Sequence, residues 1–159
     1  MQDRSIEAVC YDLTMTCASS TALTSAATVL TGVIIFVAGQ ILLKFAIEPL
    51  QEQRRAIGRA ASALIFYQDI YMNPGVAKPE FNESASRALR EVASDLLAHT
   101  NAIPNYEMWE TMNAVLPQVD VLKACGHLIG LSNSITKGHP EYNEQSRREI
   151  CTLLRLRMK

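Results

Sequence analysis

The residues of this sequence that are best suited to bind a ligand are arginines. A guanidinium group binds phosphate or carboxylate through two parallel hydrogen bonds, so clustered arginines indicate an anionic ligand or an acidic lipid headgroup. One cluster follows a long apolar segment and another lies near the C-terminus, with an amide, a hydroxyl and a lysine between them. The candidate ligand-binding residues are Arg54, Arg55, Arg59, Asn133, Ser134, Lys137, Arg147 and Arg148.

Both arginine clusters also have an interpretation that needs no ligand. Arginines directly after a membrane segment hold that end in the cytosol and contact lipid. The basic C-terminal segment, which also contains Arg155, Arg157 and Lys159, is partly balanced by three glutamates between residues 141 and 149. It would then be a solvated helix face. The sequence leaves both alternatives open.

The sequence contains no motif that is typical of an enzyme. GxSxG, Walker and GxGxxG motifs are absent, and no helix carries paired carboxylates. His99, His127 and His139 are scattered, and no CxxC or HxxxH spacing supports a metal site. We therefore expect a protein that is not an enzyme and that carries neither a metal nor a cofactor.

The four cysteines divide into two pairs along the chain. Cys10 and Cys17 precede the apolar segment, and their spacing, about 10 Å along a helix, is too long for a bridge within one helix. Each could pair across a symmetry axis, and the sequence does not decide whether either forms a disulfide. Cys125 and Cys151 lie on apolar helix faces, where we expect reduced thiols.

Composition and charge indicate one folded domain attached to a membrane. The 159 residues include 15 Lys+Arg and 16 Asp+Glu, and 48% of the chain is hydrophobic, which excludes a disordered tail and disfavours DNA binding. No Asp, Glu, Lys or Arg occurs between Leu13 and Leu43. Such a run is rare in a buried helix of a soluble protein, and the acidic N-terminus is unlike a signal peptide.

The apolar run predicts a transmembrane helix. Residues 22–43 would extend about 33 Å as a helix, enough to cross a hydrocarbon core of about 30 Å. Lys44 and the arginines after it predict that this end is cytoplasmic. We therefore divide the chain into an extracytoplasmic tail (1–20), a transmembrane helix (21–47) and a cytosolic helical domain (48–159), with the N-terminus outside and the C-terminus in the cytoplasm.

Small and polar residues recur on one face of the predicted span. Such a face allows two helix backbones to approach closely and predicts a homo-oligomer. The alternative is a plain anchor that is rich in Ala and Thr by chance. Gln40 would bond between helices, line a pore or lie near the interface. The predicted oligomer face comprises Thr21, Ser25, Thr28, Gly32, Gly39 and Gln40.

The rest of the chain predicts an all-α domain, a small bundle of four or five helices. Apolar spacing and turn residues place helices at 50–72, from 82–84 to 103, at 105–115, 118–135 and 141–159. No segment alternates with the period of a strand. The expected core residues are Ile57, Ala61, Leu64, Tyr71, Ala85, Leu89, Val92, Leu96, Ile103, Tyr106, Trp109, Met112, Leu122, Cys125, Leu128, Ile129, Tyr142, Ile150, Leu153 and Leu154.

Two segments carry a resemblance to known proteins. FAIEPLQEQRRAIGRAASALIFYQDIYMNPG, from Phe45 to Gly75, and HLIGLSNSI, from His127 to Ile135, resemble a group of uncharacterised small bacterial proteins with one N-terminal span. The layout is also similar to membrane effectors of bacterial antiviral defence, including CRISPR-associated effectors that are gated by cyclic oligoadenylates. The resemblance implies an inner-membrane protein and transfers no active site.

Two functional hypotheses follow. In the first, an oligomer of spans is coupled to a cytosolic sensor, and an anionic nucleotide messenger bridges arginines from several subunits. Binding would reorganise the spans and perturb the membrane in antiviral defence, with Asn133 and Ser134 contacting a base or ribose. In the second, the protein is a passive membrane-anchored adaptor whose helical surface docks a cytosolic protein.

Overall fold

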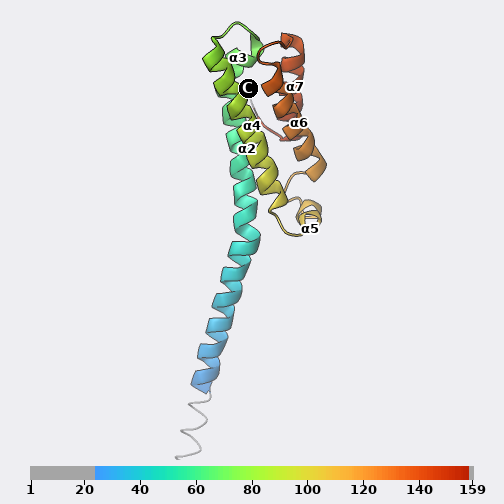
Figure 1. Ribbon diagram of the computed structural model, residues 1–159. Helices are drawn as coiled ribbons and strands as arrows, with labels where there is room; N and C mark the ends of the chain where they lie inside the picture. Colours follow the sequence, from blue (N-terminus) through green and yellow to red (C-terminus); the bar gives the residue numbers. More distant parts are fainter. Residues whose placement is uncertain (1–23, 158–159) are drawn as a thin grey trace, which may run out of the picture. The chain divides into compact units, whose positions relative to one another are not determined.

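The computed structural model describes residues 24–157 and divides into two compact units at Leu43, each of which we describe separately (Figure 1). In the first unit, residues 24–42 form one α-helix with every side chain exposed. Helical residues run from Thr24 to Phe66, and the apolar part of this run is long enough to cross a membrane. The predictions for the tail, for Thr21 and for Cys10 and Cys17 lie outside the described residues.

The second unit is entirely helical, which confirms the all-α prediction for the part of the chain that the structure describes. It starts at Lys44, within a short π-helical segment, η1 (Leu43–Ile47), a geometry that is rare in proteins. The helices that follow are α2 (Glu48–Phe66), α3 (Gln68–Met72), α4 (Pro79–Asn101), α5 (Tyr106–Thr111), α6 (Gln118–Ser134) and α7 (Pro140–Leu153).

Helix α4 is the centre of the bundle. It packs against α2 on one side and α6 on the other, while α7 packs against α6 and α3 (Figure 1). Alanines alternate with larger residues along the contact faces, which brings the helix axes close together. The fully buried residues of this core include Ala56, Ala60, Leu64, Tyr71, Ala85, Leu89, Leu96, Val121, Ala124, Leu128, Leu131 and Ile150.

The predicted helix 50–72 is wrong in one respect, because it is interrupted at Tyr67. The carbonyl of Leu64, which the N–H of residue 68 would bond in a continuous α-helix, accepts a hydrogen bond from the Tyr71 hydroxyl at 2.8 Å. The Tyr71 side chain is fully buried. A tertiary contact of a buried phenol thus accompanies the break between α2 and α3.

Two predicted helix starts lie too late in the chain. Helices α4 and α7 begin at Pro79 and Pro140, because proline suits the first helical turn, where its missing N–H costs nothing. Asn82, a predicted cap, lies inside α4 and its amide Nδ2 donates to the Ala77 carbonyl at 3.1 Å. The last helix also ends at Leu153, well before the predicted end at Lys159.

Several predicted core residues are exposed. Met112, Leu122, Ile129 and Tyr142 are 66%, 45%, 44% and 52% exposed, and Trp109 is half-buried. In α6 the predicted core residues Cys125 and Leu128 are buried, but Val121 and Ala124 point inward in place of Leu122 and Ile129. Helix α6 is apolar on more than one side, so periodicity alone does not define its buried face.

Candidate functional site

A cleft of about 220 Å³ opens in the second unit between the start of α2, the connection from α5 to α6 and the end of α7. Residues that are distant in sequence meet there, and two of them are arginines. We call it the Arg54–Arg155 cleft. Its lining comprises Gln53, Arg54, Ile57, Asn113, Ala114, Val115, Leu116, Leu154 and Arg155.

Two helices end at this cleft in the same backbone motif. Asn113 follows α5 with φ 54° and Arg155 follows α7 with φ 51°, both in the left-handed region. The N–H groups of Asn113 and Ala114 bond carbonyls in the last turn of α5, each at 2.9 Å. Those of Arg155 and Leu156 bond the last turn of α7 at 3.2 and 2.8 Å. This pattern is the Schellman motif, which turns the chain sharply at a helix end.

Arginine is an unusual residue at the left-handed position of this motif. Glycine is preferred there, asparagine tolerates it, and other residues lose about 1 kcal/mol because Cβ approaches the backbone. Asn113 is therefore ordinary at its position and Arg155 is not. The backbone conformation does not favour an arginine at this position. The presence of Arg155 must therefore be explained by what its side chain does.

The cleft has a net positive charge. Nη2 of Arg54 donates to the Ala114 carbonyl at 3.2 Å, and neither Arg54 nor Arg155 forms an ion pair among residues 24–157. The C-termini of α5 and α7 each contribute at most about −0.5 of a charge. Two guanidinium charges exceed that sum, and the cleft therefore favours an anion.

A buried polar network forms the inner wall of the cleft. Gln53 is 1% exposed, and its Nε2 donates to the hydroxyls of Tyr106 at 2.9 Å and Thr100 at 3.2 Å. The Tyr106 hydroxyl donates in turn to the Leu116 carbonyl at 2.7 Å. Burial raises the pKa of Tyr106, so this phenol stays neutral and donates. The network joins α2, α4 and α5 and fixes the loop that carries Asn113.

The other predicted arginines are paired with carboxylates. Arg55 bonds Glu52 at 2.5 Å on the same helix, and Arg59 of α2 bonds Asp95 of α4. His99 Nε2 also lies 3.1 Å from Asp95. These two arginines therefore stabilise α2 and its contact with α4, and their charges are already balanced.

Arg147 and Arg148 share one carboxylate. Both donate to Glu144 at 2.8 Å, from positions three and four residues along α7. The hydrogen bonds from Arg147 and then from Arg148 lower the pKa of Glu144 to about 2. Arg147 is partly buried, with 24% of its side chain exposed, rather than fully on the predicted polar face.

The predicted polar residues near the end of α6 have structural partners. The Asn133 Oδ1 accepts a hydrogen bond from Arg90 at 2.7 Å, and the Ser134 hydroxyl donates to Asn143 at 2.5 Å. Asn143 is fully buried, and its Nδ2 donates to the Tyr71 carbonyl at 2.6 Å. Lys137 is exposed in the connection between α6 and α7. These residues lie on other elements than the cleft lining.

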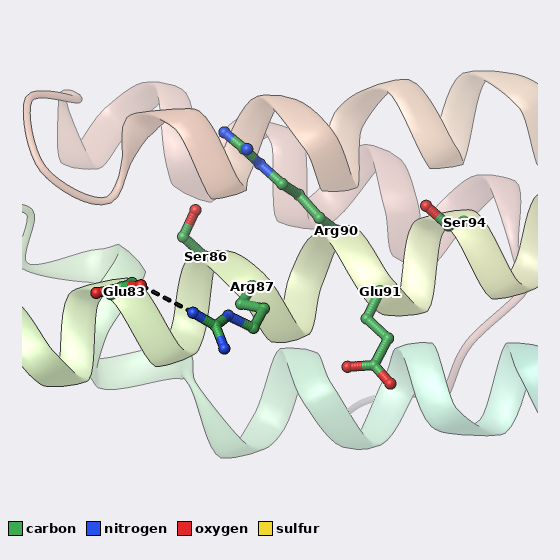
Figure 2. Close-up of a pocket in the computed structure, with 6 residues that line it drawn as sticks. All are labelled: Glu83, Ser86, Arg87, Arg90, Glu91 and Ser94. Carbon is green, nitrogen blue, oxygen red and sulfur yellow. Dashed lines mark hydrogen bonds and ion pairs between the residues drawn. The ribbon is translucent and has the colours of Figure 1, made fainter.

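A second, larger hollow of about 480 Å³ runs along α4 (Figure 2). Glu83 and Arg87 bond each other there at 2.8 Å, and Arg90 reaches away from α4 to Ser132 and Asn133 of α6. All six lining residues belong to one helix, and the charged pair is already satisfied. This shallow surface is less suited to an anion than the Arg54–Arg155 cleft.

The predicted oligomer face belongs to the first unit, and all its residues except Thr21 are among the described ones. Ser25, Thr28, Gly32, Gly39 and Gln40 are all exposed. The Thr28 hydroxyl donates to the Thr24 carbonyl at 2.9 Å, so its proton is satisfied within its own helix. A Cβ at Gly32 or Gly39 would meet no atom within 4 Å, which leaves the face open for close approach.

The sequence indicates only one of the two cleft arginines as a ligand residue. Arg54 belongs to the candidate cluster after the apolar segment, whereas Arg155 belongs to the basic C-terminal segment. A local signal is present, because no glycine follows Leu153 to end the helix, and Arg155 and Arg157 stand two and four residues after it. Nothing in the sequence indicates that Asn113 lines a cleft, because asparagine is common in turns of every kind. No protein-family model, curated protein or solved structure matches the chain.

Proposed function

We propose that the protein is a membrane-anchored binding protein whose helical domain takes a phosphate group of an anionic ligand in the Arg54–Arg155 cleft. One observation carries the proposal. Arg54 and Arg155, which are far apart in the sequence, line one cleft, and neither has a carboxylate partner among residues 24–157. Guanidinium groups recognise phosphate through pairs of hydrogen bonds.

The volume of the cleft limits the size of the ligand that it can hold. Sites for whole drug-sized molecules measure roughly 300–1,000 Å³, and this cleft measures about 220 Å³. It accommodates a phosphate group and its neighbouring atoms rather than an entire cyclic oligonucleotide. A cyclic oligoadenylate messenger would therefore have to bridge clefts from several subunits, as the oligomeric effector hypothesis requires.

The anchoring part of the proposal rests on the apolar N-terminal helix. That helix is long enough to cross a membrane, and all its side chains are exposed in the single chain. The basic residues after it favour a cytoplasmic helical domain. The resemblance to small bacterial proteins with one N-terminal span supports a location in the bacterial inner membrane. A reporter fused after Lys159 should be active only in the cytoplasm, and activity only outside would overturn the orientation.

Isothermal titration tests the ligand. The full chain in phosphatidylcholine nanodiscs would be titrated with inorganic phosphate, adenosine monophosphate and a cyclic oligoadenylate. We expect saturable binding that Arg54→Gln weakens at least severalfold and that Arg55→Gln leaves unchanged, because Arg55 is paired with Glu52. A second series in nanodiscs with phosphatidic acid would show whether a lipid phosphate competes. Absence of binding in every titration would overturn the proposal.

Self-association is tested separately. Gly32→Leu should weaken it, since a large side chain would hold two backbones apart, whereas Ile34→Leu should not. Gly32 has open space around it in the single chain, so the variant changes contacts only between chains. Equal behaviour of the two variants in a membrane two-hybrid assay would remove the oligomer face.

The adaptor hypothesis is supported by a different observation. Val119, Leu122 and Ile129 form an exposed apolar stripe on α6, with exposures of 60%, 45% and 44%. A chain that binds none of the phosphate ligands but loses a cytosolic partner on Leu122→Glu would favour the adaptor.

A further inference from the structure

Helix α5 lies at the end of the second unit where α2 begins (Figure 1). The hydrogen bond from Gln53 to the Tyr106 hydroxyl fastens the first residue of α5 to α2. Gln53 follows Ile47 by six residues, which is about 9 Å along a helix. Phe45 and Ile47, which lie directly before α2, are 64% and 39% exposed, although both are apolar. This end of the unit therefore carries apolar side chains on both α5 and the residues that precede α2.

The outer face of α5 is apolar. Tyr106 points into the bundle and is 7% exposed. Met108 and Met112 lie about 200° and 240° around the helix from Tyr106, on the opposite side. They are 49% and 66% exposed. Trp109 lies about 60° from both Met112 and Tyr106, at the edge of this face, and is half-buried.

The position of Trp109 is fixed by the protein. Its Nε1 donates to the Pro104 carbonyl at 3.1 Å, so the indole does not need water to satisfy its N–H. Indole rings with one polar edge are enriched at membrane interfaces, and flexible methionines adapt to irregular apolar surroundings. The two carboxylates of α5 do not oppose this. A Glu110 oxygen accepts from the Gln118 N–H at 3.2 Å, and Glu107 lies on the flank of the helix, where a headgroup layer is wet.

We propose that the outer face of α5, formed by Met108 and Met112 with Trp109 at its edge, inserts into the interface of the membrane in which the N-terminal helix is anchored. The occupant is lipid rather than a protein because the exposed Phe45 and Ile47 place the apolar boundary of the chain within about two helical turns of α5. The inference rests on the proposed membrane anchoring and is independent of the phosphate ligand. It makes α5 a second membrane contact, which limits the orientations of the helical domain.

The sole tryptophan of the chain makes the test direct. The full chain would be reconstituted in phosphatidylcholine vesicles that contain either a lipid brominated high in the acyl chain or a lipid with a spin-labelled headgroup. We expect either quencher to lower Trp109 fluorescence by at least a third. Met108→Glu combined with Met112→Glu should reduce this quenching at least twofold, because charged side chains leave the apolar layer, and Met108→Leu with Met112→Leu should preserve it.

A control variant and an anchoring assay separate the outcomes. Val76→Glu changes an apolar residue that is 80% exposed in the connection between α3 and α4, and should leave the quenching unchanged. Flotation of the vesicles after an alkaline wash reports the anchoring alone. A chain that does not float overturns the anchoring and this inference together. A chain that floats with unquenched Trp109, or with equal quenching in the glutamate variant, overturns the α5 contact and leaves the anchoring intact.

Discussion

The arginines of α7 and those of the Arg54–Arg155 cleft differ in what their charges meet. Arg147 and Arg148 converge on Glu144 at 2.8 Å, and the three side chains form a closed group on one helix. Arg54 and Arg155 come from different elements and meet helix ends and a carbonyl instead of a carboxylate. A count of arginines therefore does not identify an anion site, because a paired guanidinium must first lose its partner before it can bind a ligand.

The largest expected effect is on ligand binding in the cleft. Arg155→Gly should lower the affinity for the phosphate ligand at least tenfold, since charge-assisted hydrogen bonds contribute about 1.5–3 kcal/mol. The same change should raise the free energy of unfolding by up to about 1 kcal/mol, because glycine adopts φ 51° without strain. Titration calorimetry and chemical denaturation of the same sample measure both quantities.

Asn113→Gly is the matched control for that variant. It changes the other left-handed residue of the cleft to glycine without removing a charge. We expect unchanged or slightly higher stability and an affinity within about threefold of the wild type. If Arg155→Gly also left the affinity unchanged, Arg155 would serve only the helix end, and the contrast between the two arginine groups would lose its functional meaning.

A smaller effect, on stability, is expected when Glu144 can no longer pair with Arg147 and Arg148. Glu144→Gln should lower the free energy of unfolding by about 1 kcal/mol at neutral pH, because two arginines lose their charged acceptor. Glu149→Gln on the same helix is the control, since Glu149 is exposed and makes no ion pair among the described residues. The ligand affinity should not change in either variant.

The ion pairs of Glu144 also make the stability of the protein depend on pH. Hydrogen bonds from Arg147 and Arg148 lower the pKa of Glu144 from 4.5 to about 2 in the folded protein. The contribution of Glu144 to stability is therefore complete above pH 4.5 and is lost as the pH falls toward 2. Denaturation curves across this range should show a shallower loss for Glu144→Gln than for the wild type. Parallel curves would contradict the pairing.

The smallest effect is expected on the surface of α4. Arg87 and Glu83 bond each other at 2.8 Å, but their side chains are 76% and 73% exposed. Water screens such a pair, so Arg87→Ala should change the free energy of unfolding by no more than about 0.5 kcal/mol. A loss as large as that of Glu144→Gln would show that exposure does not separate the ion pairs of this domain.

Part of the arginine pairing could have been predicted from the chain alone. Glu144 precedes Arg147 and Arg148 by three and four residues, a spacing at which side chains on a helix meet. Arg59 and Asp95 offered no such signal, because they are on different helices and meet only when α2 packs against α4. The same holds for Gln53, which is polar in sequence yet 1% exposed, since Thr100 and Tyr106 satisfy it from two other elements.

The sequence by itself determined the helical class of the protein and its long apolar N-terminal helix, because both depend on the periodicity and composition of consecutive residues. It also placed most helices to within a few residues, and missed their starts where proline opens a helix. The tertiary structure decided which face of α6 is buried, where α2 breaks, and which arginines remain unpaired. Residues 54, 113 and 155 form one cleft only because helix packing brings together segments that are far apart in the chain.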